Sequence, residues 1–293
     1  MTWHGGRSEQ AELQTLSIDG LELIDTDDYW FEAADGLDAP VRRIASTVNP
    51  GSDGGFVAST LYGMRGVSLS GALKNNGAAA MSAARSALGA ACLLKRDVNG
   101  VRQLKTISFT LLDGRQFIFQ AEVSSFKAPN FGTGPVEFLI SLIAEDPLLY
   151  DPEEKSSGNI VRATGGGLII PFVSPAVSAA SSGGAGIATN SGNSDTPLIM
   201  KLVGPLTSPY ILNQASGLFM QLDYTIPAGP TVLIDTSDNT ILIEGGGSLF
   251  DRRASGVSFF KLLPGANPIV FSTSDSSDTG HLELLWHDGS ICP

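Results

Sequence analysis

The apolar positions of this chain fall into many short runs instead of long helical periods. The runs are rich in Val, Ile, Leu and Phe, and Gly, Pro, Asn or Asp bound each of them. Such runs with turn residues between them are typical of β-strands. One stretch differs, because residues 77–94 are rich in Ala with apolar positions three and four residues apart, and Asn75 and Asn76 precede it as candidate N-caps. The pattern predicts an all-β protein with one helix.

The strongest local turn signal lies at Asp113-Gly114-Arg115, between the β-rich runs 104–112 and 116–126. An Asp-Gly pair between two such runs predicts a tight β-hairpin, because both residues tolerate a positive φ.

Two further segments of the first half carry strand signals. Residues 17–24 alternate apolar and polar positions around Asp19-Gly20, which predicts a short hairpin. Residues 136–143 predict another strand, which ends before Pro147 because proline cannot donate to a ladder.

The composition changes over residues 150–167, which are rich in polar residues and glycine and predict a linker. We therefore expect two domains, 1–155 and 156–293. Closely spaced short strands in the second predict a β-sandwich, while the Ala/Ser/Gly-rich segment 174–186 predicts a loop. The expected strands of this half are 168–173, 186–190, 198–203, 210–213, 218–226, 231–235, 240–244, 257–262, 269–272 and 281–286.

The chain has 293 residues and a formal net charge of −12, from 18 Lys+Arg and 30 Asp+Glu. Residues 1–38 hold ten of the carboxylates and one arginine, so they carry −9 and the remaining 255 residues carry −3. No stretch of clustered Lys and Arg is visible, which argues against a protein that grips nucleic acid by its phosphates. The acidic segment predicts a solvated arm with turns or, alternatively, a pairing arm in an oligomer.

The motifs of common enzymes are missing from the sequence. It has no Gly-x-Ser-x-Gly elbow and no Gly-Lys dipeptide of a phosphate loop. His281 and His287 flank the last strand six residues apart, about 20 Å when extended, which is too far to share a metal. We expect no enzyme, no cofactor and no metal, although a pair of carboxylates from distant segments leaves a glycoside hydrolase as an alternative.

Aromatic residues offer a second function. Trp286 lies near the end of the last predicted strand, and exposed aromatic rings on a sandwich can stack against sugar rings. The alternative function is therefore a carbohydrate-binding module that contacts a host cell surface, with Trp286 as its surface-binding aromatic. Core packing is the commoner use of a tryptophan.

Several blocks together resemble a known family. The most specific are residues 226–236 (IPAGPTVLIDT) and 258–271 (SFFKLLPGANPIVF), preceded by Thr196-Pro-Leu-Ile and Tyr210-Ile-Leu-Asn. In the first half, 51–55 and the following 63–71 (GMRGVSLSG) agree in order. The sequence resembles the distal tail proteins of long, non-contractile-tailed phages, the siphovirus-type tail component.

The resemblance implies a β-sandwich or split-barrel-like belt domain that forms a homohexameric ring, followed by a galectin-like sandwich. Such a hub joins the tail tube to tail-tip proteins, a tail-associated lysin or receptor-binding proteins, and genomic DNA only passes through its channel. The implied location is the tail tip of the virion, after assembly in the host cytoplasm and without membrane anchoring. The hairpin at Asp113, Gly114 and Arg115 is the predicted oligomer interface or channel element.

Overall fold

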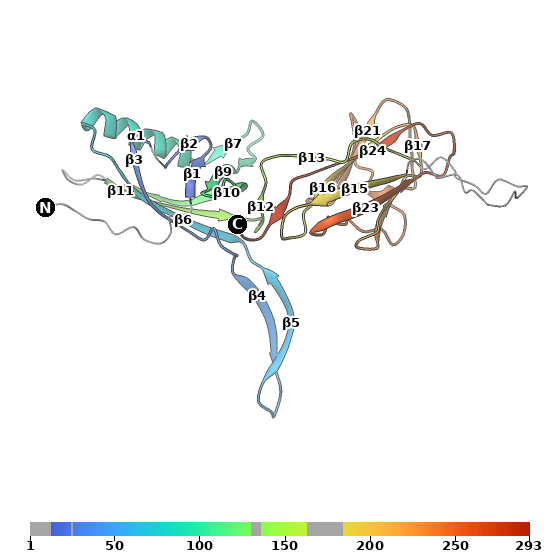
Figure 1. Cartoon of the computed structure of the whole chain (residues 1–293), viewed down its shortest axis with the longest axis horizontal. Helices are drawn as coiled ribbons and strands as arrows, with labels where there is room; N and C mark the ends of the chain where they lie inside the picture. The colour runs from blue at the N-terminus through green and yellow to red at the C-terminus, as the bar shows by residue number, and fades with distance from the viewer. Residues whose placement is uncertain (1–12, 25, 130–135, 163–183) are drawn as a thin grey trace, which may run out of the picture. The chain divides into compact units, whose positions relative to one another are not determined.

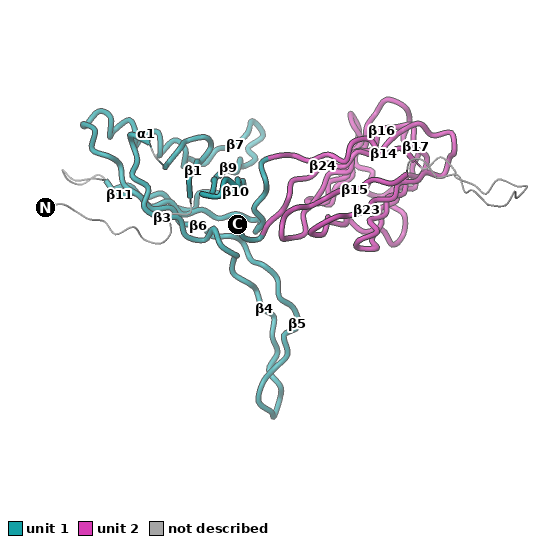
Figure 2. The backbone as a smooth tube through the Cα atoms, in the orientation of Figure 1, with its two compact units in different colours: residues 1–152, 291–293 teal, residues 153–290 magenta. Residues whose placement is uncertain are grey.

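The computed structural model describes residues 13–24, 26–129, 136–162 and 184–293. It is almost entirely β-structure with a single α-helix in the described part of the chain, which confirms the predicted fold class (Figure 1). The chain divides into two compact units, Met1–Pro152 with Ile291–Pro293 and Glu153–Ser290 (Figure 2). We call them unit 1 and unit 2.

Unit 1 is built on one antiparallel sheet in the order β2-β1-β9-β10-β11-β6-β3, with β12 paired to β10. Two separate ribbons, β4–β5 and β7–β8, extend from it. The strands are β1 (Leu13–Ile18), β2 (Leu21–Glu22), β3 (Tyr29–Asp35), β4 (Arg42–Val48), β5 (Gly55–Tyr62), β6 (Arg65–Leu73), β7 (Lys95–Arg96), β8 (Arg102–Gln103), β9 (Lys105–Leu111), β10 (Gln116–Lys127), β11 (Val136–Ala144) and β12 (Leu149–Tyr150).

Both predicted hairpins of the first half are confirmed. The chain turns from β1 into β2 at Asp19 and Gly20, whose φ angles of 49° and 84° suit a tight two-residue hairpin turn. It turns from β9 into β10 at Asp113-Gly114, where Gly114 has a φ of 88°. The predicted strand at 136–143 is β11, the central neighbour of β10 and β6.

The helix α1 (Ala78–Cys92) confirms the Ala-rich prediction but begins differently. Gly77 is its N-cap and no side chain caps it, because Asn76 instead donates its side-chain amide to the carbonyl of Asp27. The buried residues of α1 are Ala84, Leu88 and Cys92, and they pack on the sheet. The three- and four-residue spacing therefore predicted the buried face correctly.

Strict alternation along the central strands builds the core of unit 1. In β6 and β11 every second side chain is buried, and Phe109 of β9 stacks on Phe117 of β10 at 5.4 Å between ring centroids. Each such large side chain contributes about 1.5–3 kcal/mol by leaving water. The sheet carries this core on the face that α1 covers.

Asp19 fixes the first hairpin to the sheet. Its carboxylate accepts hydrogen bonds from the ammonium groups of Lys105 and Lys95, at 3.0 and 3.2 Å, and from the backbone N–H of Thr106. Burial raises the pKa of Asp19, but the bonds from Lys105, Thr106 and Lys95 outweigh it and hold the pKa below its ordinary value of 3.8.

We expect Asp19→Asn to lower the free energy of unfolding by about 1–3 kcal/mol at neutral pH, because Lys105 is buried and loses its only carboxylate partner among the described residues. A lowered folded-state pKa gives stability that is present above 3.8 and is lost as the pH falls through the folded value. Urea unfolding of both proteins between neutral pH and about pH 3 tests this, since the difference must shrink only below about pH 4. A difference that stays constant down to that pH contradicts the ion-pair explanation.

Unit 2 is a sandwich of two antiparallel sheets, in the orders β13-β24-β16-β21-β22, with β14 on β24, and β15-β23-β18-β19. One buried cluster draws side chains from both sheets, as the predicted sandwich requires. The strands of unit 2 are β13 (Lys155–Ser156), β14 (Ile160–Val161), β15 (Ala185–Asn190), β16 (Leu198–Val203), β17 (Leu206–Thr207), β18 (Tyr210–Asn213), β19 (Leu218–Gln221), β20 (Thr225–Ile226), β21 (Thr231–Asp235), β22 (Thr240–Ile243), β23 (Gly265–Ser272), β24 (His281–Trp286) and β25 (Gly289–Ser290). The unit also contains a single-turn helix, η1 (Phe250–Arg252).

Two predicted strands of this half are wrong. The predicted strand 218–226 is interrupted by a bend at residues 223–224 and forms two strands, β19 paired with β18 and β20 paired with β17. Residues 257–262 form no strand, and only Leu262 among them forms a β-bridge, with Thr196. Phe260 and Leu262 are buried, so the alternation reflects contact with the core and not a ladder. The predicted strand at 168–173 and most of the predicted loop at 174–186 lie outside the described residues.

Candidate functional site

The described ranges show no cluster of metal-binding side chains. No group of three or more His, Cys, Asp or Glu side chains there is placed to hold a metal ion. No helix among those residues is both long and apolar enough to cross a membrane. The features of the molecule that are suited to a function are surfaces that would contact other molecules.

The most unusual surface of unit 1 is the ribbon formed by β4 and β5, which we call the arm. Its register runs from Arg42 opposite Tyr62 to Val48 opposite Gly55, with a bulge beside Ala45. Figure 1 shows the two strands leaving the sheet of unit 1 as a free ribbon. Apart from the partly buried Tyr62, every residue of both strands is exposed.

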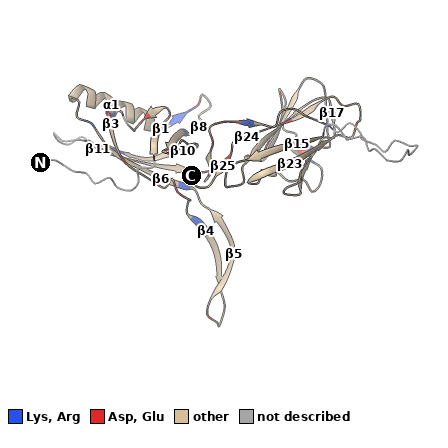
Figure 3. Cartoon of the chain, in the orientation of Figure 1, with Lys and Arg blue, Asp and Glu red and all other residues tan. Residues whose placement is uncertain are grey.

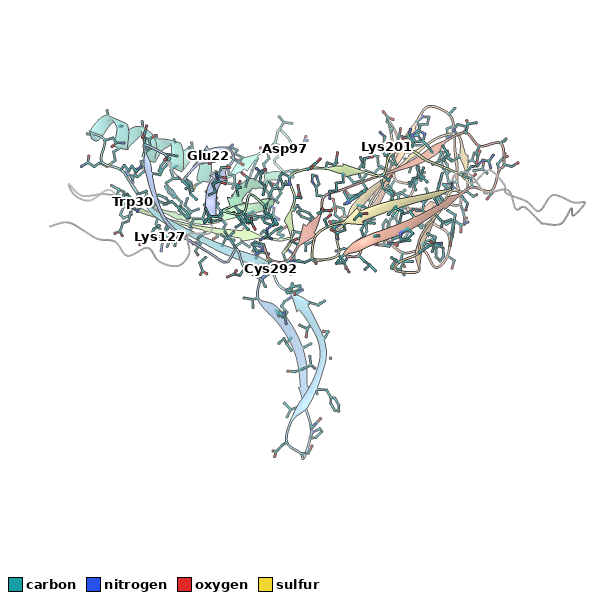
Figure 4. The ribbon with its side chains drawn as sticks, viewed as in Figure 1. Glu22, Trp30, Asp97, Lys127, Lys201 and Cys292 are labelled. Carbon is teal, nitrogen blue, oxygen red and sulfur yellow. The ribbon has the colours of Figure 1, made fainter. Side chains whose placement is uncertain are left out.

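Large apolar side chains occupy both faces of the arm. Val48 is 79% exposed and Phe56 72%, and Ile44, Val57 and Leu61 are also exposed. Figure 4 shows side chains as sticks along the whole ribbon, which no other described part of unit 1 covers. A two-stranded hairpin without a covering layer is at best marginally stable in water. The arm therefore has the composition of an element that a partner covers.

The edges of the arm are unprotected. Between Ile44 and Leu61 the only charged residue is Asp53, at the tip, and the ribbon in Figure 3 has blue residues only at its base. Free edge strands usually carry Lys, Pro or bulges that prevent pairing with other chains. The arm thus presents two strand edges that are competent to pair, apart from its single bulge.

Arg65 anchors the base of the arm. Its side chain is fully buried, and the guanidinium donates to five backbone carbonyls. Nη1 bonds the carbonyls of the turn between β3 and β4, and Nε and Nη2 bond those of two other segments of unit 1. The accepting residues are Gly36, Leu37, Asp38, Pro147 and Ile291.

Burial lowers the pKa of Arg65 to about 10, while the nearby Cys292, Asp146 and Asp38 oppose this shift. The group is therefore still cationic at neutral pH. No carboxylate among the described residues forms a salt bridge with it, so its direct hydrogen bonds all go to backbone carbonyls.

Close backbone contacts complete this base. Gly36 has a φ of +87°, and a Cβ atom there would lie 2.0 Å from the carbonyl oxygen of Gly66. The N–H of Gly63 donates to the carbonyl of Val41 at 2.8 Å, so the two segments that enter the arm are hydrogen-bonded to each other at its base. The arm is therefore a fixed extension of the β3–β6 pair and not a loose loop.

The structure places Asp113, Gly114 and Arg115 at an exposed, self-contained turn. Asp113 accepts from the backbone N–H of Arg115 at 3.0 Å and from its Nε at 2.7 Å, and the first of these bonds contributes most to the lowered pKa of Asp113. These bonds explain the turn without a partner. A role of the three residues in an oligomer interface or channel stays a prediction.

Trp286 is not a surface residue, which corrects the sequence-based expectation. Its side chain is 5% exposed within the core of unit 2, and its Nε1 donates to the carbonyl of Thr189 at 3.2 Å. No ring face is open to a sugar. The exposed tryptophan of the described chain is Trp30 on β3, labelled in Figure 4 and 67% exposed. Carbohydrate binding stays a prediction, but Trp286 gives it no support.

Sequence reasoning missed the arm, although a signal was present. Two β-rich runs, 42–48 and 55–62, flank the turn-rich segment NPGSDGG, which is the pattern of a hairpin with a longer loop. What the pattern cannot show is that neither face of this hairpin is covered within the chain.

The comparisons with known proteins agree with this architecture. Residues 191–285 match the family profile described as the siphovirus-type tail component, C-terminal domain. No curated protein sequence matches the chain significantly.

Solved structures resemble the fold over both units. The Dit protein (gp 19.1) of SPP1, described as a paradigm of the hub adsorption apparatus in phages that infect Gram-positive bacteria, matches with a TM-score of 0.65 and 14% identity, over 94% of this chain and 98% of that one. A chain of the phage P2 baseplate in its activated conformation with Ca matches with a TM-score of 0.50 and 10% identity, over 95% and 99%. At such identities the likeness establishes the fold.

Proposed function

We propose that this chain, which has the fold of a phage tail hub and a siphovirus-type tail component domain at residues 191–285, closes into a homohexameric ring at the tail tip. The resemblance to distal tail proteins that the sequence motifs indicate is confirmed at the level of fold and domain family. The structural role follows from both. The ring, its partners and the division of labour below are the proposal.

The arm is the structural feature that gives the proposed ring its main support. An element with both faces apolar, both outer edges unpaired and a base bonded into the sheet is suited to lie against another surface of the next copy. A contact between an arm and a different surface is heterologous, and six such contacts close when each rotates the chain by one sixth of a turn. Pairing of strand edges would add backbone hydrogen bonds to the apolar contact.

The two predicted domains would then have different roles. We assign ring formation to residues 1–155, the belt domain, and assign to residues 156–293, the galectin-like sandwich, the contacts with other tail components. The ring would join the tail tube to tail-tip proteins, a tail-associated lysin or receptor-binding proteins. It would assemble in the host cytoplasm and reside in the virion.

Charge supports a channel through which DNA passes without sticking. Residues 1–38 carry −9, and an acidic wall repels phosphates instead of binding them. We place acidic side chains of this segment, with the turn at Asp113 and Gly114, at subunit contacts or along the channel.

The ring is tested by measuring mass in solution together with electron microscopy. Six copies of 30.6 kDa give about 184 kDa, and we expect this species and six-fold images with a central hole. The measurement is repeated with the tail tube protein added, because some rings close only on a partner. Monomers under both conditions, at every concentration and salt, would reject the ring.

A further inference from the structure

A cluster of aromatic and basic side chains lies at one edge of unit 2, far along the chain from the arm. We call Phe250, Arg252, Arg253, Phe259 and Lys261 the Arg253 patch. The ring of Phe250 is exposed and stacks on Phe259, with 6.2 Å between centroids and 17° between planes. The Arg253 guanidinium carbon lies 3.6 Å from the centroid of Phe250 and 5.6 Å from that of Phe259.

Local structure holds Arg253 in this position. Its Nε donates to the carbonyl of Phe250 at 2.9 Å, across the single turn η1. The segment that carries it lies along β19, with bonds from the N–H of Ala254 to Gln221 and from that of Ser258 to Phe219. A guanidinium that is oriented before binding loses less entropy when it meets a planar anion.

The charges of unit 2 set this patch apart. Residues 153–290 contain twelve Asp+Glu and six Lys+Arg, for a net charge of −6, yet residues 250–261 contain three cations and one carboxylate. The cations elsewhere in unit 2 are engaged: Lys155 pairs with Asp288, Lys201 with Glu283, and Arg162 bonds the backbone of Ser276 and Asp278.

The three cations of the Arg253 patch have no carboxylate partner among the described residues. Arg252 and Lys261 are exposed, and the alternation of burial from Phe259 to Leu262 puts Phe259 and Lys261 on the same outer side. Cations without a carboxylate partner beside the exposed ring of Phe250 and the partly buried ring of Phe259, in a unit of opposite net charge, favour an anionic ligand that also offers an apolar surface.

We propose that the Arg253 patch binds an anionic saccharide that bears a carboxylate or phosphate group. The part of the Phe250 ring that Arg253 leaves exposed would contact the C–H face of a sugar, and the terminal nitrogens of Arg253 would bind its anion, with Arg252 and Lys261 at the rim. Five side chains suit one or two sugar units, whereas a stable protein interface takes about 20–30 residues from each partner. A surface ligand of this kind rests on the proposed location at a tail tip.

The test uses the full chain and three polymers as probes: polygalacturonate for carboxylate, poly(glycerol phosphate) for phosphate, and neutral dextran. We expect binding to at least one anionic polymer and none to dextran, with weaker binding as salt rises. Phe250→Ala and Arg253→Gln should each weaken binding about tenfold or more. Lys201→Gln removes the same charge from unit 2 outside the patch and should leave binding unchanged.

Three results would overturn the proposal: no anionic polymer binds the native chain, dextran binds equally well, or both patch variants bind like the native chain. If a tail protein bound the chain through Arg253 and no polymer bound it, the ligand of the patch would be a protein and the saccharide proposal would also be overturned. Thermal unfolding of each variant checks the fold. The mass of each sample is measured as well, with and without the tail tube protein. A ring without polymer binding rejects only the patch, and polymer binding by a chain that stays monomeric under both conditions rejects only the ring.

Discussion

Replacing Arg65 by alanine is expected to lower the free energy of unfolding of unit 1 by about 3–5 kcal/mol, or roughly 10 °C in its melting temperature. The substitution leaves five partly buried carbonyls without this donor and empties the fully buried site of the Arg65 side chain. A stability of about 5–15 kcal/mol is usual for a domain, so the loss is a large share of it. Urea unfolding followed by tyrosine and tryptophan fluorescence measures it.

Two further variants make the Arg65 prediction specific. Arg65→Lys keeps the charge but has one compact ammonium in place of a fork, so we expect an intermediate loss. Arg115→Ala is the matched control, because it removes an exposed arginine of the same unit and should change stability by less than about 0.5 kcal/mol. An Arg65→Ala protein as stable as this control would show that the carbonyls find other donors.

The second large effect concerns assembly. We expect the double variant Ile44→Lys, Phe56→Lys to be monomeric under conditions where the native chain forms its ring. The two side chains lie on opposite faces of the arm, since Phe56 pairs with Thr47, three residues from Ile44. Both are exposed, so two lysines cost the isolated chain little, whereas a buried interface must desolvate both charges.

The arm prediction is read from the mass in solution, with thermal unfolding as the check on the fold. Leu242→Lys, an exposed apolar position of unit 2, is the matched control and should leave the ring intact. A double variant that still assembles at the native concentration would exclude the arm from the subunit contact, without excluding a ring built in another way.

Local patterns predicted the elements whose causes are local. The positive-φ turns at Asp19-Gly20 and Asp113-Gly114, the Ala-rich helix and most strands of unit 2 depend on neighbouring residues, and the structure confirms them. The segment 257–262 shows the limit of this reasoning. Its alternation is that of a strand, but whether a neighbouring strand pairs with it is not a local property.

The features that carry function were decided by packing. A tryptophan near a strand end is consistent with surface or core, and Trp286 is buried because it joins the core cluster that both sheets of unit 2 form. Arg65 looks like any strand arginine until segments 29, 82 and 226 residues away along the chain bring their carbonyls to it.

The sequence by itself determined the all-β class, the single helix, the principal turns and the likeness to tail components, because hydrophobic period, turn chemistry and motif order are written along the chain. The tertiary structure alone decided that residues 42–62 stand uncovered and that their base is fixed by Arg65. The physical reason is that burial is a relation between distant segments. A run of apolar residues is core where the fold covers it and a contact surface where the fold does not.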